Sequence, residues 1–235
     1  MCLIAIAHDV SSRYPLVIAA NRDEDYDRAS HDAHFWPDAP DVLGGRDAVA
    51  GGSWLAITRG GRFAAVTNLR GATPRTRSRG ALVSDFVTSE TAPSAYAEAV
   101  HARAEEYAGF HLLAGEARGE VAHVTPQQSV LLTPGIYALS NAPLGEEWPK
   151  TRAAVEEMDV ALRMDDAESL LLVLMQFLAA SRGTQSVESE VFIAGERYGT
   201  RASTVVVMTP EGTLFGEQSF TRGGVPYSMN RLFRL

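Results

Sequence analysis

The sequence predicts a single α+β domain over residues 1–235. Strand-like and helix-like segments come in separate runs: strands, helices, strands, helices, strands. Such runs are typical of helices packed outside sheets, whereas a Rossmann-type chain alternates one strand with one helix. No G-x-G-x-x-G or P-loop motif occurs, so nucleotide binding through a glycine-rich loop is not expected. A hydrophobic content of 46% with 21% charged residues is that of a globular protein with one sizeable core.

The first third of the chain predicts strands. Apolar runs at 3–7 and 15–20 flank a polar turn, and two more strands, at 54–58 and 62–69, flank the turn signal RGG. Between these pairs, residues 21–52 carry acidic and aromatic side chains without a clean period. We expect a long loop there, and loops of that length inside a compact domain are usually functional.

The rest of the chain predicts two pairs of helices separated by strands. The first pair covers about 78–87, with Ser78 as N-cap, and 93–107. The second pair begins near Pro149 and at Asp165 or Asp166. Strands are expected at 110–114, 121–124, 130–132, 136–140, 189–199, 201–210 and 212–220.

Composition excludes several classes of protein. No apolar run reaches the ~18 residues of a membrane-spanning helix, and no basic leader is visible, so we expect no membrane span and a cytoplasmic location. A net charge of -8 argues against binding to nucleic acid phosphates. A single cysteine excludes an internal disulfide framework. The expected partner is a small molecule, and the sequence makes no prediction of oligomeric state.

That single cysteine is Cys2, which becomes the N-terminal residue if the initiator Met1 is removed. Its thiol and a free α-amine would then share one Cα, and their reference pKa values, about 8.5 and about 7.7–8.0, make proton transfer between them easy. This arrangement activates a nucleophile without a histidine. The alternative is a small hydrophobic residue buried at the edge of a first strand.

Residues 21–24, Asn-Arg-Asp-Glu, follow the second apolar run. If the first two strands pair as a hairpin, this cluster comes close to Cys2. Arg22 would then lower the thiol pKa, and a carboxylate such as Asp23 would hold the α-amine or orient the arginine. The alternative is a solvated polar turn.

Three more polar residues lie at the ends of strands. Asn68 and Asn141 each close a strand, and an asparagine amide is a suitable donor to a developing oxyanion; each is also a common turn or cap residue. Arg201 precedes a strongly β-branched strand, where it would bind a carboxylate or stabilise negative charge, or form a surface ion pair.

The histidines do not form a metal site in the sequence. His31 and His34 are the only close pair, and no H-E-x-x-H or comparable ligand spacing occurs. No G-x-S-x-G elbow appears either. We therefore expect no metal and no obligatory cofactor.

Six ordered blocks resemble a known family: MCLIAIA, NRDE, GGSWLAI, RFAAVTNLR, LSNAPLGEEWPK and YGTRASTVVV. Together they resemble the NRDE-signature proteins, also called the transport and Golgi organisation type 2 family, over nearly the whole domain. That family is regarded as related to the N-terminal nucleophile (Ntn) hydrolases. The resemblance implies their four-layer αββα sandwich.

Within that superfamily the functional analogy is to bile-salt hydrolases and penicillin V acylases. The resemblance places their working residues at Cys2, Arg22, Asp23 or Asp25, Asn68, Asn141 and Arg201. Spacing in the acylases favours Asp25 and the NRDE signature favours Asp23, so both acids stay open. Glu24, Asp25 and Trp54 are expected to contact substrate.

Two functions follow as hypotheses. The first is an N-terminal-cysteine hydrolase that cleaves an amide, ester or thioester bond of a small acylated substrate. The second is a non-enzymatic binding or trafficking protein for haem or an acyl or lipid ligand, with Cys2, His31 or His34 as contacts. No C-x-x-C-H or other haem motif supports a haem ligand directly.

Overall fold

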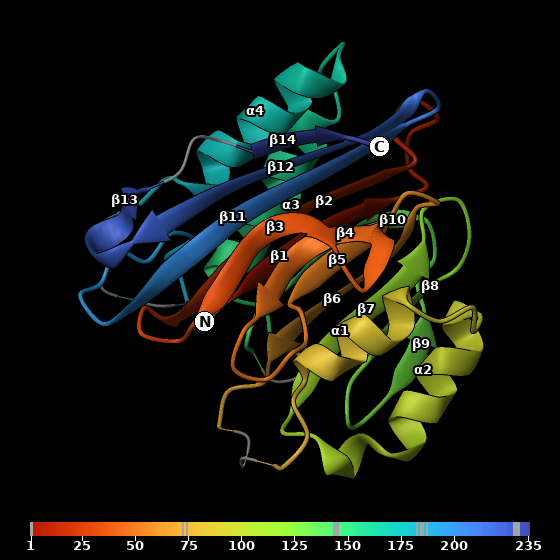
Figure 1. The fold of residues 1–235 in the computed structure, drawn as a ribbon. Helices are drawn as coiled ribbons and strands as arrows, with labels where there is room; N and C mark the ends of the chain where they lie inside the picture. Colours follow the sequence, from red (N-terminus) through yellow and green to blue (C-terminus); the bar gives the residue numbers. More distant parts are fainter. Residues whose placement is uncertain are drawn as a thin grey trace. The chain divides into compact units, whose positions relative to one another are not determined.

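The computed structural model describes residues 2–71, 73, 75–142, 146–181, 183, 186, 188–227 and 231–235. Met1, and with it the predicted processing, lies outside the described residues, as do residues 143–145 of the LSNAPLGEEWPK block. The chain forms two compact units (Figure 1). Unit 1 is Met1–Arg28 with Pro134–Leu235, and unit 2 is Ala29–Thr133. The prediction of one domain over 1–235 stays a prediction.

Unit 1 contains an antiparallel sheet in the order β10-β1-β2-β11-β12-β13, with β14 also paired to β12. Its strands are β1 (Leu3–His8), β2 (Leu16–Asp25), β10 (Gly135–Leu139), β11 (Tyr198–Thr209), β12 (Gly212–Thr221), β13 (Val225–Pro226) and β14 (Arg231–Arg234). β1 and β2 form the predicted hairpin, in which Leu3 pairs with Asn21 and His8 with Leu16. β1 therefore lies in the interior of the sheet, between β10 and β2.

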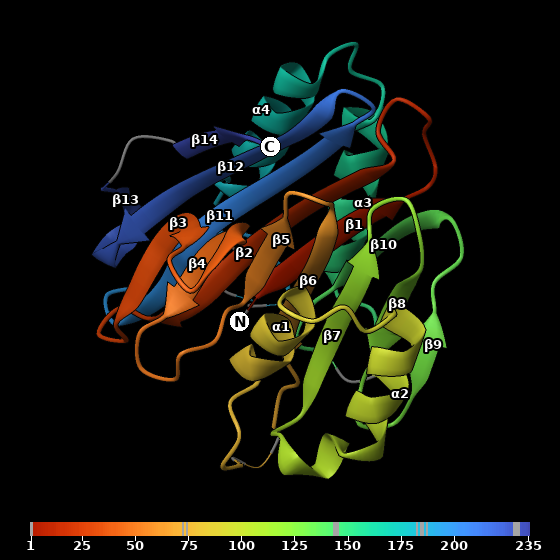
Figure 2. The ribbon, with the colours of Figure 1, turned by 45° about the vertical axis from the view of Figure 1, so that its right-hand side comes forward.

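Helices α3 (Pro149–Ala161) and α4 (Ala167–Leu178) cover one face of this sheet (Figure 2). Alternate residues of β1, β2 and β11 face them, because side chains alternate along a strand. The shared core includes Leu3, Ala5, Val17, Ala19, Met158, Leu174, Val205 and Val207. Polar side chains at the strand ends are thus divided between a helix-side face and the opposite face.

Unit 2 contains the antiparallel sheet β3-β4-β5-β6-β7-β8-β9. Its strands are β3 (Ser30–Trp36), β4 (Ala39–Asp47), β5 (Leu55–Thr58), β6 (Arg62–Asn68), β7 (Phe110–Glu116), β8 (Val121–Val124) and β9 (Ser129–Leu131). Helices α1 (Gly80–Val87) and α2 (Pro93–Ala102) cover one face. Their core includes Leu82, Phe86, Tyr96, Val100, Phe110, Leu112 and Val124. Each unit supplies one sheet and one helix layer, the components that an αββα architecture requires.

Two predicted segments are wrong. Residues 21–52 are not a long loop: β2 continues through Asp25, and β3 and β4 form a hairpin. Mixed burial along β3, together with two breaks in the β3–β4 register, removed the period-2 pattern that marks a strand. Conversely, most of 189–199 is irregular, because β11 begins only at Tyr198.

The predicted helix starts are confirmed to within two residues. Asp166 is the N-cap of α4, where its carboxylate accepts a hydrogen bond from the Ser169 N–H at 2.8 Å. The N-cap of α1 is Arg79, not the predicted Ser78. Among the described residues, none of the helices has the length and apolar composition needed to span a bilayer.

Unit 2 buries a histidine pair. His111 of β7 stacks on His123 of β8 with ring centroids 5.3 Å apart, and His111 Nδ1 lies 3.1 Å from His123 Nε2. Burial, assisted by the nearby His111, lowers the pKa of His123 from 6.5 to about 4. The folded state therefore favours neutral His123.

This shift makes stability depend on pH. An unfolded histidine takes up a proton near pH 6.5 and the folded one only near pH 4, so the free energy of unfolding should fall as pH decreases through that window. At about 1.4 kcal/mol per pKa unit the loss is roughly 3 kcal/mol. Urea unfolding of His123→Gln at pH 4.5 and 7 should show a smaller difference than wild type, and the exposed His31→Gln should not. Equal pH dependence in wild type and His123→Gln would contradict this assignment.

Candidate functional site

Cys2 directly precedes β1, in the interior of the unit 1 sheet. Leu3 pairs with Asn21 of β2, and one more step along the antiparallel ladder sets Cys2 opposite Arg22. Residues opposite one another in an antiparallel pair point to the same face. The side chains of Cys2 and Arg22 therefore share one face of the sheet.

β10 brings Asn141 to the other side of Cys2. Ile4 and Leu139 are the last residue pair at this end of the β1–β10 ladder, and Asn141 is buried two residues past the end of β10. The Ser140 hydroxyl donates a 2.8 Å hydrogen bond to the Cys2 carbonyl oxygen and holds the segment after β10 beside Cys2. Asn141, Cys2 and Arg22 thus come from three neighbouring strands or the residues that flank them, and we call these three residues the row.

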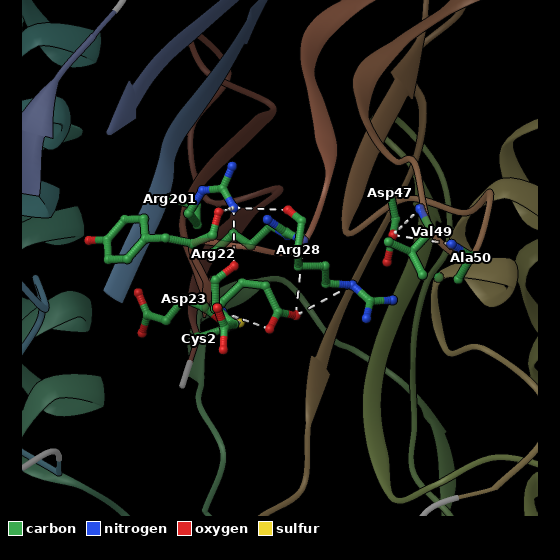
Figure 3. A network of polar contacts seen from close by, with 12 residues as sticks. Cys2, Arg22, Asp23, Arg28, Asp47, Val49, Ala50 and Arg201 are labelled. Carbon is green, nitrogen blue, oxygen red and sulfur yellow. Dashed lines mark hydrogen bonds and ion pairs between the residues drawn. The ribbon is translucent and has the colours of Figure 1, made fainter. Parts of the chain in front are cut away.

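This row lies on the face away from α3 and α4. Leu3 and Ala5 pack into the helix-side core, and alternation along the strand turns Cys2 to the other face. The Cys2 thiol is half-buried, is not in a disulfide, and lies 3.9 Å from the backbone oxygen of Asp23 (Figure 3). A thiol in this position is partly accessible to solvent.

Arg22 supplies a nearly buried guanidinium to the row. Its side chain is 7% exposed, and its Nη2 lies 4.0 Å from Glu24 Oε2. The same oxygen lies 3.8 Å from Arg28 Nε, so Glu24 links two arginines (Figure 3). A cation on the residue opposite a thiol favours the thiolate.

Asp23 points to the helix side of the sheet and is buried. Burial raises the pKa of this carboxyl, while a 2.7 Å hydrogen bond from the Thr200 hydroxyl to Oδ1 and the ammonium of Lys150 oppose the rise. The Tyr198 hydroxyl donates to the Asp23 backbone oxygen at 2.9 Å. Asp23 is therefore a firmly held acid beside the start of β1.

Asp25 has the opposite environment. Hydrogen bonds from the Asp27 N–H and from Arg197 Nε, each 2.9 Å long, lower its pKa. The Arg197 side chain is largely exposed, so this pair lies at the protein surface. Of the two acids that the sequence left open, only Asp23 is buried next to Cys2.

Arg201 lies within β11, at a break in register between Thr200 and Ala202. Its Nη1 donates hydrogen bonds of 3.0–3.2 Å to the backbone oxygens of Asp25, Tyr26 and Arg28 (Figure 3). The guanidinium thereby organises the chain that leaves β2.

The structure places the other predicted residues in unit 2. Asn68 is the last residue of β6 and is exposed, and Trp54 is half-buried just before β5. The Trp54 ring packs on Gly45, where a Cβ would come within 2.1 Å of it. His31 and His34 of β3 lie with ring centroids 6.1 Å apart. In the described ranges no group of three or more His, Cys, Asp and Glu side chains could hold a metal ion.

Sequence reasoning missed Lys150, the second residue of α3. It is 1% exposed, and it interacts electrostatically with the titratable groups Asp23 and Cys2. One signal was available: Lys150 is the only lysine among the 21 lysine and arginine residues of the chain.

The two-sheet α+β architecture is that of the Ntn hydrolases. The whole chain superimposes on penicillin V acylase from Agrobacterium tumefaciens with a TM-score of 0.55, 10% identity and 86% of that chain covered. It also superimposes on the C2A mutant of conjugated bile acid hydrolase from Clostridium perfringens, with a TM-score of 0.56, 9% identity and 92% covered. At such identities the likeness concerns the fold alone, and the predicted fold class is confirmed.

The chain belongs to the Transport and Golgi organisation 2 family, whose model matches residues 1–221. It is 32% identical to the Transport and Golgi organization 2 homolog of Mus musculus over 257 aligned positions, with 93% of each chain covered. The Homo sapiens homolog is 31% identical over 258 positions, again with 93% of each covered. The resemblance seen in the sequence is confirmed.

Asn21, the first residue of the NRDE tetrapeptide, anchors the site from the helix side. Its Nδ2 donates to the backbone oxygens of Leu178 and Val191 at 2.8 and 2.9 Å, and its Oδ1 accepts a 2.6 Å hydrogen bond from the Ser203 hydroxyl. The Asn21 amide and the Ser203 hydroxyl are buried, and both are hydrogen-bonded within the fold. The side chain ties β2 to β11, to the end of α4 and to the segment before β11.

Loss of this anchor should be costly. Asn21→Ala leaves two buried carbonyl oxygens without their donor, so we expect the free energy of unfolding to fall by about 3 kcal/mol. Ser203→Ala removes one hydrogen bond and should cost about 1 kcal/mol. Urea titrations measure both, and a loss below 1 kcal/mol for Asn21→Ala would contradict the anchoring role.

Proposed function

We propose that the protein is an N-terminal-cysteine hydrolase that cleaves an amide, ester or thioester bond of a small acylated substrate. The observation that carries the proposal is that the only thiol of the chain directly precedes β1, the strand between β2, which carries Arg22, and β10, which leads to the buried Asn141. The neighbouring Asp23 and the fold shared with two acylases support it.

The reaction follows from these groups. After removal of Met1, the Cys2 α-amine takes the thiol proton, and the thiolate forms a bond to the substrate carbonyl carbon. The Asn141 amide with a backbone N–H donates hydrogen bonds to the oxyanion. The Cys2 ammonium then gives its proton to the leaving amine, alcohol or thiol as the bond to the carbonyl carbon breaks. Water, deprotonated by the same amine, releases the acid and restores the thiol.

Two residues would set the position and the charge of the reacting groups of Cys2. The buried Asp23 is the acid placed to hold the Cys2 amine, because Asp25 is engaged with Arg197 at the surface. Arg22 would stabilise the thiolate. Glu24 and Arg201 then act on the surrounding chain, through the Arg22 and Arg28 pairs and the three backbone oxygens. The catalytic role of Asn68 as an oxyanion donor and the contact of Trp54 with substrate remain predictions.

A panel of N-acyl amides, acyl esters and acyl thioesters tests the proposal. On any substrate that the wild type hydrolyses, Cys2→Ala should lose at least about 10³-fold in rate, because no other thiol replaces the nucleophile. Asn141→Ala should lose roughly 10²–10³-fold in kcat, as expected for one oxyanion donor. Mass spectrometry of each preparation establishes whether Met1 has been removed. Full activity in Cys2→Ala, or in protein that retains Met1, would exclude the mechanism.

A second candidate is a binding or trafficking protein for haem or an acyl or lipid ligand, in the cytoplasm. The names of the curated relatives, which concern transport and Golgi organisation, favour it. Cys2 in unit 1, or His31 and His34 in unit 2, would then be ligand contacts.

Titration with haemin separates the two candidates. If the protein binds haem through its thiol, the Soret band should shift on addition of about one equivalent, and the shift should be absent in Cys2→Ala. His31→Ala and His34→Ala report on the histidines in the same way. No shift in wild type would leave hydrolysis as the proposal.

A further inference from the structure

Lys150 is unusual in both composition and position. Every other member of the 21 lysine and arginine residues is arginine. Lysines are almost never fully buried unless they are paired, and Lys150 is 1% exposed. Unlike a guanidinium, an ammonium is a compact point charge whose pKa shifts readily on burial.

The fold places Lys150 near the strands that carry the Cys2 site. α3 packs against β10 and β1, and Lys150 lies in its first turn, on the helix side of the sheet where Asp23 also points. The Lys150 N–H donates to the Glu188 backbone oxygen at 3.1 Å, and its Nζ lies 5.5 Å from the centre of the Trp148 ring. The first contact fixes the backbone at the start of α3, and the second is a cation–π contact of the ammonium within unit 1.

Lys150 interacts electrostatically with Asp23 of β2, with Cys2 just before β1, and with Glu188 and Glu190 of the segment before β11. Burial lowers the pKa of Lys150, and interactions with these groups, Asp23 first, oppose that fall. Glu190 also accepts a 3.1 Å hydrogen bond from the Ser181 hydroxyl.

A cation beside the buried Asp23 carboxyl has a clear electrostatic effect. Burial raises the pKa of the Asp23 carboxyl, and a nearby positive charge opposes that rise. Arg22 points to the opposite face of the sheet, whereas Lys150 lies on the same side as Asp23. A positive charge near Cys2 also lowers the cost of forming the thiolate.

We propose that Lys150 is a positioning residue of the Cys2 site: its buried ammonium keeps Asp23 ionised and favours the Cys2 thiolate. The catalytic meaning of this role rests on the proposed hydrolase function. The electrostatic role itself is measured on the thiol and on the lysine, without any substrate.

The first test is the pH dependence of Cys2 alkylation by iodoacetamide, which is specific because the chain has one cysteine. Lys150→Met keeps the side-chain length and removes the charge. The midpoint of the rate profile should rise by about one pH unit, so that the rate at pH 7 falls about tenfold. Lys150→Met with native circular dichroism and an unchanged midpoint would overturn the proposal.

Arg152→Met is the matched control. It removes one positive charge from an exposed position on the same turn of α3, with the same replacement side chain. We expect the alkylation rate at pH 7 to stay within about twofold of wild type, because exposed charges are screened. An equal loss in both variants would mean that net charge, not the buried ammonium, controls the thiol, and would overturn the proposal.

A second measurement does not depend on the folding of Lys150→Met. Protein made with ¹³C-labelled lysine gives a single side-chain ε-carbon resonance, that of Lys150. Its titration should have a midpoint below 10.5 and a second inflection where the Cys2 thiol titrates, and Cys2→Ser should lose that inflection. Identical titrations in wild type and Cys2→Ser would overturn the proposal. If both tests succeed while no substrate is cleaved, the hydrolase function fails and the role of Lys150 stands.

Discussion

β1 is hydrogen-bonded on both sides, to β10 and to β2, and this double pairing is the constraint on which the Cys2 site depends. A terminal segment held on one side only would fray, and a thiol on it would have no fixed neighbours. Here the two ladders run to Leu3 and Ile4, so that the segment with Cys2 leaves the sheet between the end of β10 and the Asn-Arg-Asp-Glu end of β2. The Ser140 hydroxyl adds a side-chain hydrogen bond to the Cys2 backbone at the end of the ladder. The position of Cys2 is therefore determined mainly by the backbone pairing of β1.

The NRDE tetrapeptide forms the end of β2, and its residues alternate between two faces of the sheet that have different environments. Asn21 and Asp23 point to the helix side, where buried hydrogen bonds satisfy them. Arg22 and Glu24 point to the other face and pair with each other. Because the period of a strand is two, a shift of one residue in the β1–β2 register would exchange the two pairs completely. The four residues therefore act as two pairs. Asn21 and Asp23 hold the strand in place through hydrogen bonds, and Arg22 and Glu24 carry charge beside the thiol.

Much of the fold was predictable because apolar patterns mark buried elements. The helical spacing of Leu82 and Phe86 and the apolar runs of β1 and β7 gave correct helices and strands. β3 was missed, because its half-buried, histidine-containing pattern does not alternate. The neighbourhood of Cys2 could be predicted from the hairpin and from the family resemblance. The role of Asn21 and the approach of Lys150 could not, since both depend on contacts with residues more than 100 positions away in sequence.

The scarcity of lysine has a consequence beyond the site. With its single lysine enclosed in unit 1, the folded chain presents no lysine amine to solvent. Chemistry directed at the lysine amine, from small acylating reagents to enzymes that attach groups to lysine, then requires unit 1 to open around α3. The extent of Lys150 labelling would then report how often unit 1 opens. The native protein would be resistant to every modification that begins at a lysine side chain.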